Sequence, residues 1–162
     1  MAADEQADWT VEQRTRIVEL LDEYRTRLHD VLDGLSEEEA RRSLVPSKTT
    51  LLGLVKHVTF VEGVWFDQAI TGRTYAEIGI ASTVDGSFSL RASDSIASVQ
   101  AACRERWEVS RANLDGLASD DVVDGRGPRP VWALELQVLR ELAQHLGHAE
   151  ILREQVLAAR SS

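Results

Sequence analysis

The sequence predicts an all-α fold, a four-helix bundle with a long connection between the second and third of its long helices. Apolar residues recur at intervals of three and four through four long segments, the spacing of one face of an amphipathic helix. Capping residues precede these segments, and turn-forming residues fill the stretches between them. With 162 residues, 43% of them hydrophobic, the chain is long enough to enclose a core. We therefore expect residues 1–162 to form a single domain, with residues 1–8 as a flexible tail.

The charge balance narrows the classes of partner. A formal net charge of −9 argues against nucleic-acid binding and against docking on an anionic membrane, because both favour a basic surface. No apolar run reaches the roughly 18 residues of a membrane span, and residues 1–5 lack the apolar core of a signal peptide. A cytoplasmic protein is therefore expected. Cys103 is the only cysteine, which excludes an intrachain disulfide.

The first long helix is predicted to begin after Thr10, because Thr10 and Gln13 have the spacing of a capping box. Its apolar face continues to residue 32, and Gly34 supplies a stop. His29 falls outside that face, so we expect it to be exposed to solvent. A second capping box at Ser36 predicts a short helix that ends near residue 43.

The second long helix is predicted over residues 51–71, between the break at Pro46 and a stop at Gly72. Its competing N-caps are Ser47, Thr49 and Thr50. His57 lies at the edge of its apolar stripe rather than opposite it.

Residues 73–93 break the helical pattern and are rich in turn formers. A connection this long inside a compact domain usually has a role. It lets the chain cross from one end of the bundle to the other, and it could form a wall of a ligand site. Phe88 and Leu90 alternate with serines, which predicts a brief extended segment.

The third long helix is predicted to begin after Asp94 or Ser95. Cys103 has core spacing on it, so we interpret this residue as a small core side chain rather than a catalytic thiol. Residues 120–130 form a polar loop, and Pro130 suits the start of the last helix, over residues 131–159.

The last helix carries the pattern with most chemical meaning. Glu141 and His145 are four residues apart at core positions, so their side chains can point at one centre. A buried carboxylate and imidazole cost free energy unless something pairs with them. His57 is the best third member, because it is the only other histidine near a core face. Two histidines and one glutamate with an open position are typical of catalytic zinc sites, and they also fit non-haem iron.

The spacing leaves other interpretations open. A histidine on an apolar helix face is often only hydrogen-bonded in the core, and Glu141 could pair with Arg140 or Arg104. His148 is a rival ligand, or a residue that orients a ligand from behind or faces the substrate. Two further carboxylates off the main stripe are weaker ligand candidates, Glu62 and Glu150.

Three segments carry a resemblance to a known family: residues 45–57, the pairs 61–62 and 65–66, and residues 141–154, the most specific. With the helix order, they make nearly the whole chain similar to the DinB-like (DinB/YfiT) superfamily of four-helix metalloproteins. The closest branch is the actinobacterial one related to mycothiol-dependent maleylpyruvate isomerase. The resemblance implies a DinB-like bundle with metal ligands His57, Glu141 and His145. The branch often has a histidine where this chain has Gln137.

The resemblance also implies an activity. Relatives transfer or isomerise substrates with low-molecular-weight thiols, so we expect a metal-dependent thiol S-transferase or isomerase. Its cofactor would be a divalent metal, zinc first, with nickel and iron as alternatives. Its partners would be mycothiol as co-substrate and an electrophile. A metal-dependent hydrolase and a non-catalytic bundle or dimerisation protein are the alternatives, and a homodimer fits the relatives.

Overall fold

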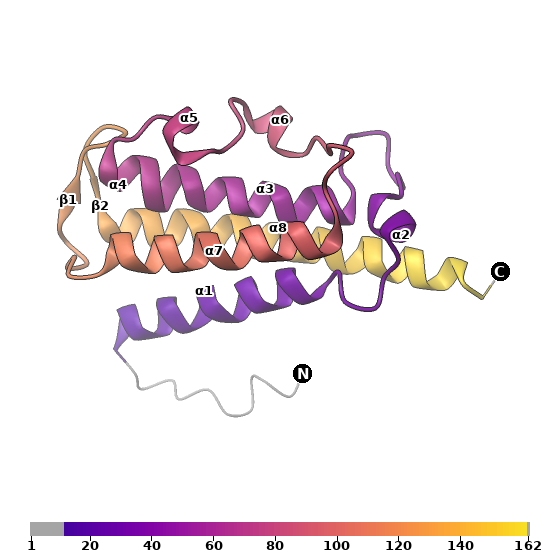
Figure 1. Cartoon of the computed structure of the whole chain (residues 1–162). Helices are drawn as coiled ribbons and strands as arrows, with labels where there is room; N and C mark the ends of the chain where they lie inside the picture. The colour runs from indigo at the N-terminus through magenta and orange to yellow at the C-terminus, as the bar shows by residue number, and fades with distance from the viewer. Residues whose placement is uncertain (1–11, 162) are drawn as a thin grey trace.

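Four long helices dominate the computed structural model, which describes residues 12–161 (Figure 1). They are α1 (Gln13–Asp30), α3 (Leu51–Gly63), α7 (Ile96–Leu114) and α8 (Val131–Ala159). α8 packs against α1 and α3, and α3 also packs against α7. Helices hold 67% of the chain. Among the described residues, the only sheet pairs β1 (Val122–Val123) with β2 (Arg129–Pro130). The all-α prediction is confirmed.

The start of α1 differs from the predicted one. The Glu12 side chain accepts hydrogen bonds from the backbone N–H groups of Arg14 and Thr15, which makes Glu12 the N-cap and lowers its pKa. The predicted cap Thr10 and the predicted tail, residues 1–8, lie outside the described residues. The prediction that His29 is exposed was wrong. Its side chain is 16% exposed, because Trp107 of α7 packs on the ring at 5.6 Å between centroids.

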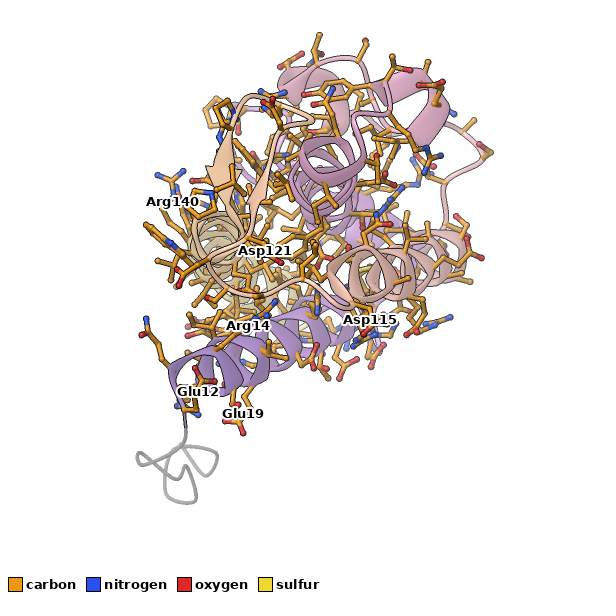
Figure 2. All side chains as sticks on the ribbon, turned by 90° about the vertical axis from the view of Figure 1, so that its left-hand side faces the viewer. Glu12, Arg14, Glu19, Asp115, Asp121 and Arg140 are labelled. Carbon is orange, nitrogen blue, oxygen red and sulfur yellow. The ribbon has the colours of Figure 1, made fainter. Side chains whose placement is uncertain are left out.

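Arg14 ties α1 to its neighbours at the end of the molecule where α1 begins (Figure 2). Its Nε donates to Glu135 of α8 at 3.1 Å, and its Nη1 donates to the carbonyl of Leu117 at 2.5 Å. Glu135 is buried, and its other carboxylate oxygen has no hydrogen-bond partner in the part of the chain that is described. One arginine thus joins α1, α8 and the segment after α7.

The capping predictions for the next elements hold. Ser36 forms the capping box of α2 (Glu37–Arg41), which ends two residues before the predicted position. Thr50 is the N-cap of α3, where its side chain accepts from the N–H of Gly53 at 3.0 Å. α3 is almost wholly buried, so it is the central element of the core.

The segment predicted as one helix over 51–71 changes geometry part-way. After α3 it continues as the π-helical turn η2 (Val64–Gln68) and then as α4 (Ala69–Thr71), ending at Gly72 with φ 77°. The hairpin of β1 and β2 packs on this end, where the N–H of Gly125 donates to the carbonyl of Ala69 at 3.0 Å. A Cβ at Gly125 would lie 2.1 Å from the carbonyl oxygen of Gln68. Glycine therefore permits the close approach of these backbones.

The connection 73–93 lies along α3 and contains two short helices, α5 (Tyr75–Ile78) and α6 (Val84–Ser87) (Figure 1). The predicted extended segment does not include Phe88, because Phe88 is the C-cap of α6 and has right-handed helical angles, φ −85° and ψ −13°. A Cβ at Gly53 would lie 2.8 Å from the carbonyl oxygen of Phe88. The absence of a side chain at Gly53 lets residues 84–88 pack directly against α3 beside His57.

The last two long helices begin as predicted. Ser95, one of the two expected caps, forms a capping box at the start of α7, and Pro130 precedes α8. Cys103 lies in the core, as predicted. Within residues 12–161, no helix combines the length and apolarity that crossing a membrane requires.

Candidate metal centre

His57 of α3 lies close to Glu141 and His145 of α8, whose four-residue spacing places them on one face of that helix. Each residue offers one ligand atom, and these atoms all lie within 4.8 Å of one another. The two imidazole rings are edge to face, with centroids 4.5 Å apart. Nε2 of His145 lies 3.4 Å from a carboxylate oxygen of Glu141. Two nitrogens and one oxygen from two helices thus form a group that could hold a metal ion.

His57 is held as a neutral imidazole. His57 is only 4% exposed, and the Phe88 ring stacks on the imidazole ring with centroids 4.0 Å apart. This burial, with a smaller contribution from His145, lowers the pKa of His57 from 6.5 to about 4. An unprotonated imidazole is the form that binds a metal.

Ser87 determines which nitrogen of His57 carries the hydrogen. The Ser87 hydroxyl lies 2.8 Å from Nδ1 of His57 and donates its single hydrogen to the carbonyl of Val84 at 2.5 Å. Because that hydrogen is used, the hydroxyl can only accept from His57. Nδ1 therefore carries the ring hydrogen, and the lone pair of Nε2 is free for the ligand group.

Glu141 is positioned by two neighbours on its own helix. Its Oε1 accepts from Gln137 at 3.3 Å and from Arg140 at 3.1 Å, while its Oε2 is the oxygen near His145. Arg140 is 65% exposed, so this ion pair contributes little to stability. Arg104, the other expected partner, contacts Nε2 of His29 instead. The carboxylate is therefore not neutralised by a buried arginine.

His148 lies at the rim of the group and is not one of its three members. It is exposed, and its Nδ1 lies 3.4 Å from Nδ1 of His145. Burial lowers the pKa of His145, Glu141 opposes this effect and His148 adds to it. If Nε2 of His145 is a ligand, its Nδ1–H can donate to His148. The role behind a ligand or facing a substrate stays a prediction for His148.

Comparison with known proteins identifies the family of the chain. The family model for mycothiol-S-transferase matches residues 16–158, which is most of the chain. The chain belongs to the mycothiol-S-transferase family. This is a DinB-like family, so the relationship expected from the sequence is confirmed. A search of curated proteins finds no match.

The weaker ligand candidates of this mycothiol-S-transferase family member lie elsewhere. Glu62 accepts from both Arg25 and Ser110 inside the core, and Glu150 pairs with Arg27 at the surface. Neither belongs to the ligand group. Cys103 is also separate from it. Burial raises the pKa of the Cys103 thiol to about 12, so the thiol is not a nucleophile at neutral pH.

Sequence reasoning did not identify Ser87 or Phe88. It predicted only that residues 73–93 could form a wall of a ligand site, and Ser87 and Phe88 now occupy that place beside His57. No residue spacing links them to His57, thirty positions away, because the link depends on how the connection folds. The one available signal was Gly53, a glycine within an apolar helix, which indicates that another backbone approaches closely.

Proposed function

We propose that the chain is a metal-dependent mycothiol S-transferase or isomerase in which His57, Glu141 and His145 hold one divalent metal ion. The observation that carries the proposal is the convergence of two imidazole nitrogens and a carboxylate oxygen within 4.8 Å, in a member of the mycothiol-S-transferase family. Three protein ligands leave a coordination position open for a substrate. Zinc suits this set best, and nickel or iron would also fit it.

The chemistry of these donors fits a divalent metal. Both histidines have lowered pKa values, and the Ser87 contact leaves Nε2 of His57 free. The Glu141 side chain is 20% exposed, so the group opens to solvent on this side. When bound, the metal would lower the pKa of a coordinated thiol and keep it as the thiolate nucleophile.

The surrounding residues support such a reaction. Phe88 covers His57 and excludes water from that side, while the exposed side lies next to His148. His148 is exposed on this side, with its Nδ1 3.4 Å from Nδ1 of His145, so it can orient His145 or face the substrate. The electrophile approaches from the same open side, and the proton that mycothiol loses as it binds leaves to solvent there.

We also propose that the fold is a DinB-like four-helix bundle. We further propose that the protein is a homodimer located in the cytoplasm. Exposed apolar side chains on α1 and α8 support pairing of two copies: Val18, Trp132, Leu136 and Ile151. Light scattering of the purified protein measures its mass. A mass of one chain would contradict the homodimer without affecting the metal centre.

Elemental analysis tests the ligands. Wild-type protein purified without added metal should contain about one metal ion per chain, and the His145→Ala variant should contain almost none. His29→Ala is the matched control, because His29 is a half-buried histidine outside the ligand group. Equal metal content in all three proteins would contradict the proposal.

Dependence on a thiol tests the reaction. Wild-type protein should conjugate mycothiol to the electrophile monochlorobimane, and His145→Ala should not. Metal-dependent hydrolysis of ester substrates without any thiol would indicate the hydrolase alternative. Full metal occupancy with neither activity would indicate a non-catalytic metal-binding bundle.

A further inference from the structure

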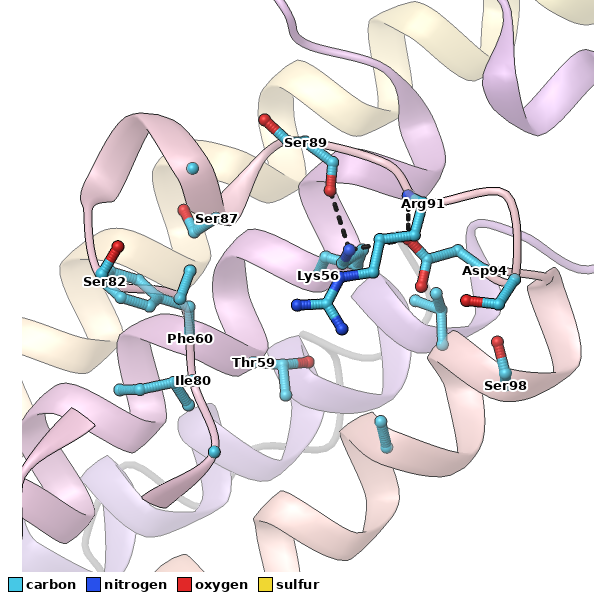
Figure 3. Close-up of a pocket in the computed structure, with 16 residues that line it drawn as sticks. Lys56, Thr59, Phe60, Ile80, Ser82, Ser87, Ser89, Arg91, Asp94 and Ser98 are labelled. Carbon is cyan, nitrogen blue, oxygen red and sulfur yellow. Dashed lines mark hydrogen bonds and ion pairs between the residues drawn. The ribbon is translucent and has the colours of Figure 1, made fainter. Parts of the chain in front are cut away.

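A second site lies on the other side of the connection from the metal centre. A cavity of about 660 Å³ opens between α3, α7 and residues 79–98, as Figure 3 shows. Its lining includes Lys56 and Thr59 of α3, and none of the three candidate metal ligands. The volume lies in the range of small-molecule sites. Ser87 is in its wall and also contacts His57, so the cavity and the metal centre share one residue.

Two of the charges in this cavity neutralise each other. Lys56 donates to Asp94 at 2.7 Å and to the carbonyl of Ser89 at 2.8 Å. Burial opposes the charge on Asp94, but the hydrogen bonds from Lys56 and from the N–H of Arg91 outweigh it and lower the pKa of Asp94. The Lys56–Asp94 pair is therefore a fixed, neutral part of the wall.

Arg91 supplies a third charge that has no such partner. Its backbone is fixed, because its N–H donates to Asp94 at 2.6 Å and its carbonyl accepts from Arg41 at 3.0 Å. Its guanidinium makes no hydrogen bond or ion pair with any residue in 12–161, although its charge acts on Asp94 and helps to lower the pKa of that carboxyl. Figure 3 shows the side chain extending over the cavity toward Lys56 and Thr59. The cavity thus has a net positive charge in a chain whose net charge is −9.

Serine side chains also line the cavity. Three serines of the lining have hydroxyls with no hydrogen-bond partner among the described residues: Ser82, Ser89 and Ser93. Phe60, Ile80 and Val99 provide an apolar part of the lining. A free guanidinium with several free hydroxyls suits a ligand that has an anionic head and a hydroxylated body.

We propose that this cavity binds a small hydroxylated organic carboxylate, with its carboxylate on the guanidinium of Arg91 and its hydroxyls on the serines. A guanidinium pairs with a carboxylate through two parallel hydrogen bonds. A single uncompensated positive charge matches a monoanion. The site requires no metal and goes beyond the proposed function. Through Ser87, its ligand would lie next to the side of His57 that faces away from α8.

Amide-detected NMR titration of the chelator-treated protein tests the site. The probes are gluconate and its uncharged analogue glucitol, a polyol of the same length. Gluconate should shift the amide signals of residues 82–98, and glucitol should shift them much less. Arg91→Gln should weaken gluconate binding about tenfold or more, because charge-assisted hydrogen bonds are lost. Arg27→Gln makes the same charge change on α1, away from the cavity, and should bind as wild type does.

A second pair of variants tests the cavity itself. Ala102→Trp should block gluconate, because Ala102 lines the cavity, while Ala112→Trp on the same helix should not. Stronger binding of glucose 6-phosphate than of gluconate would show that the site prefers a phosphate head group, and would overturn the proposal of a carboxylate ligand. The proposal of an anion site would be overturned by any of three results: equal shifts with gluconate and glucitol, no shift with gluconate, or unchanged gluconate binding by Arg91→Gln. None of these results depends on metal loading.

Discussion

At the scale of the residue, the free nitrogen of His57 depends on Ser87. We expect Ser87→Ala to weaken zinc binding by about 10- to 100-fold, because the ring loses the contact that fixes its tautomer and orientation. Competition with a chromophoric chelator measures the affinity. Ser89→Ala is the control, since its hydroxyl contacts no described residue. Equal zinc affinity for wild type and Ser87→Ala would show that the contact does not position the ring.

The buried thiol of Cys103 leads to a separate prediction about the stability of the protein at alkaline pH. Burial raises its pKa from 9.0 to about 12 in the folded protein, so above pH 9.0 the unfolded chain loses this proton first. The free energy of unfolding should therefore fall as pH rises above 9.0, by up to about 1.4 kcal/mol per pH unit from this group. Urea unfolding at about pH 8 and about pH 10 should show a smaller loss in Cys103→Ala than in wild type. Identical losses would contradict the assignment to Cys103.

The grouping of the candidate ligand residues was predictable, whereas the residues that support them were not. Glu141 and His145 are linked by helical spacing, and His57 was the only other histidine near a core face. Ser87 acts through a contact between a loop and a helix, which periodicity does not encode. The error at His29 has a similar cause. It lies off the apolar stripe of its own helix, but Trp107 of another helix covers it.

At the scale of the element, a buried ion pair connects three helices. Arg25 of α1 donates to both oxygens of Glu62 of α3, at 2.7 and 3.0 Å, and Ser110 of α7 donates to Glu62 at 2.7 Å. Glu62→Ala should lower the free energy of unfolding by about 3–5 kcal/mol, because it leaves the buried charge of Arg25 with only the part-exposed Asp22 as a partner. Denaturant unfolding measures this loss.

Two controls separate burial from charge in that experiment. Glu150→Ala also removes a carboxylate that pairs with an arginine of α1, but at the surface, and should cost less than about 1 kcal/mol. The double change Arg25→Met and Glu62→Met removes both charges and should recover much of the stability. A small effect of Glu62→Ala would contradict the buried pair as a major contributor.

The contact between the hairpin and η2 predicts opposite effects for two glycines. Gly125→Ala should destabilise the protein by about 1–3 kcal/mol, because its Cβ would meet the backbone of residues 68–72. Gly147→Ala should stabilise it by about 0.5–1 kcal/mol, because Gly147 is inside α8 with no neighbour within 4 Å of its Cβ position. Thermal unfolding of both variants measures the two shifts. Equal effects would contradict the backbone contact.

Element boundaries were predictable where a cap or a stop specifies them. Thr50, Ser95 and Gly72 each mark a boundary that the structure places there. The π-helical turn η2 has no such signal, because its residues also suit an α-helix. Its geometry coincides with the packed hairpin and with Asp67, which accepts from Arg73 and Arg106 in the core. These contacts join distant segments and leave no periodic pattern.

At the scale of the whole molecule, acidic groups in the interior are matched by arginines. Three carboxylates that are buried, Glu62, Asp67 and Glu135, each accept from at least one arginine of another element. Glu141 is different, since it is half-buried and the only arginine that pairs with it is the exposed Arg140 of its own helix. Of these four carboxylates, the one without an arginine from another element is thus the one beside the two imidazoles. This contrast supports a cation as its partner.

A metal ion bound by residues of α3 and α8 would join the two helices and stabilise the folded chain. At a free zinc concentration of about 100 times the dissociation constant, the gain is about 2.7 kcal/mol, which corresponds to a rise of about 5–10 °C in Tm. Calorimetry of chelator-treated protein with and without zinc should show this rise in wild type and in His29→Ala. It should be absent in His57→Ala and in His145→Ala, although these residues are on different helices. A normal rise in His57→Ala would mean that zinc binds to α8 alone, and would remove α3 from the metal centre.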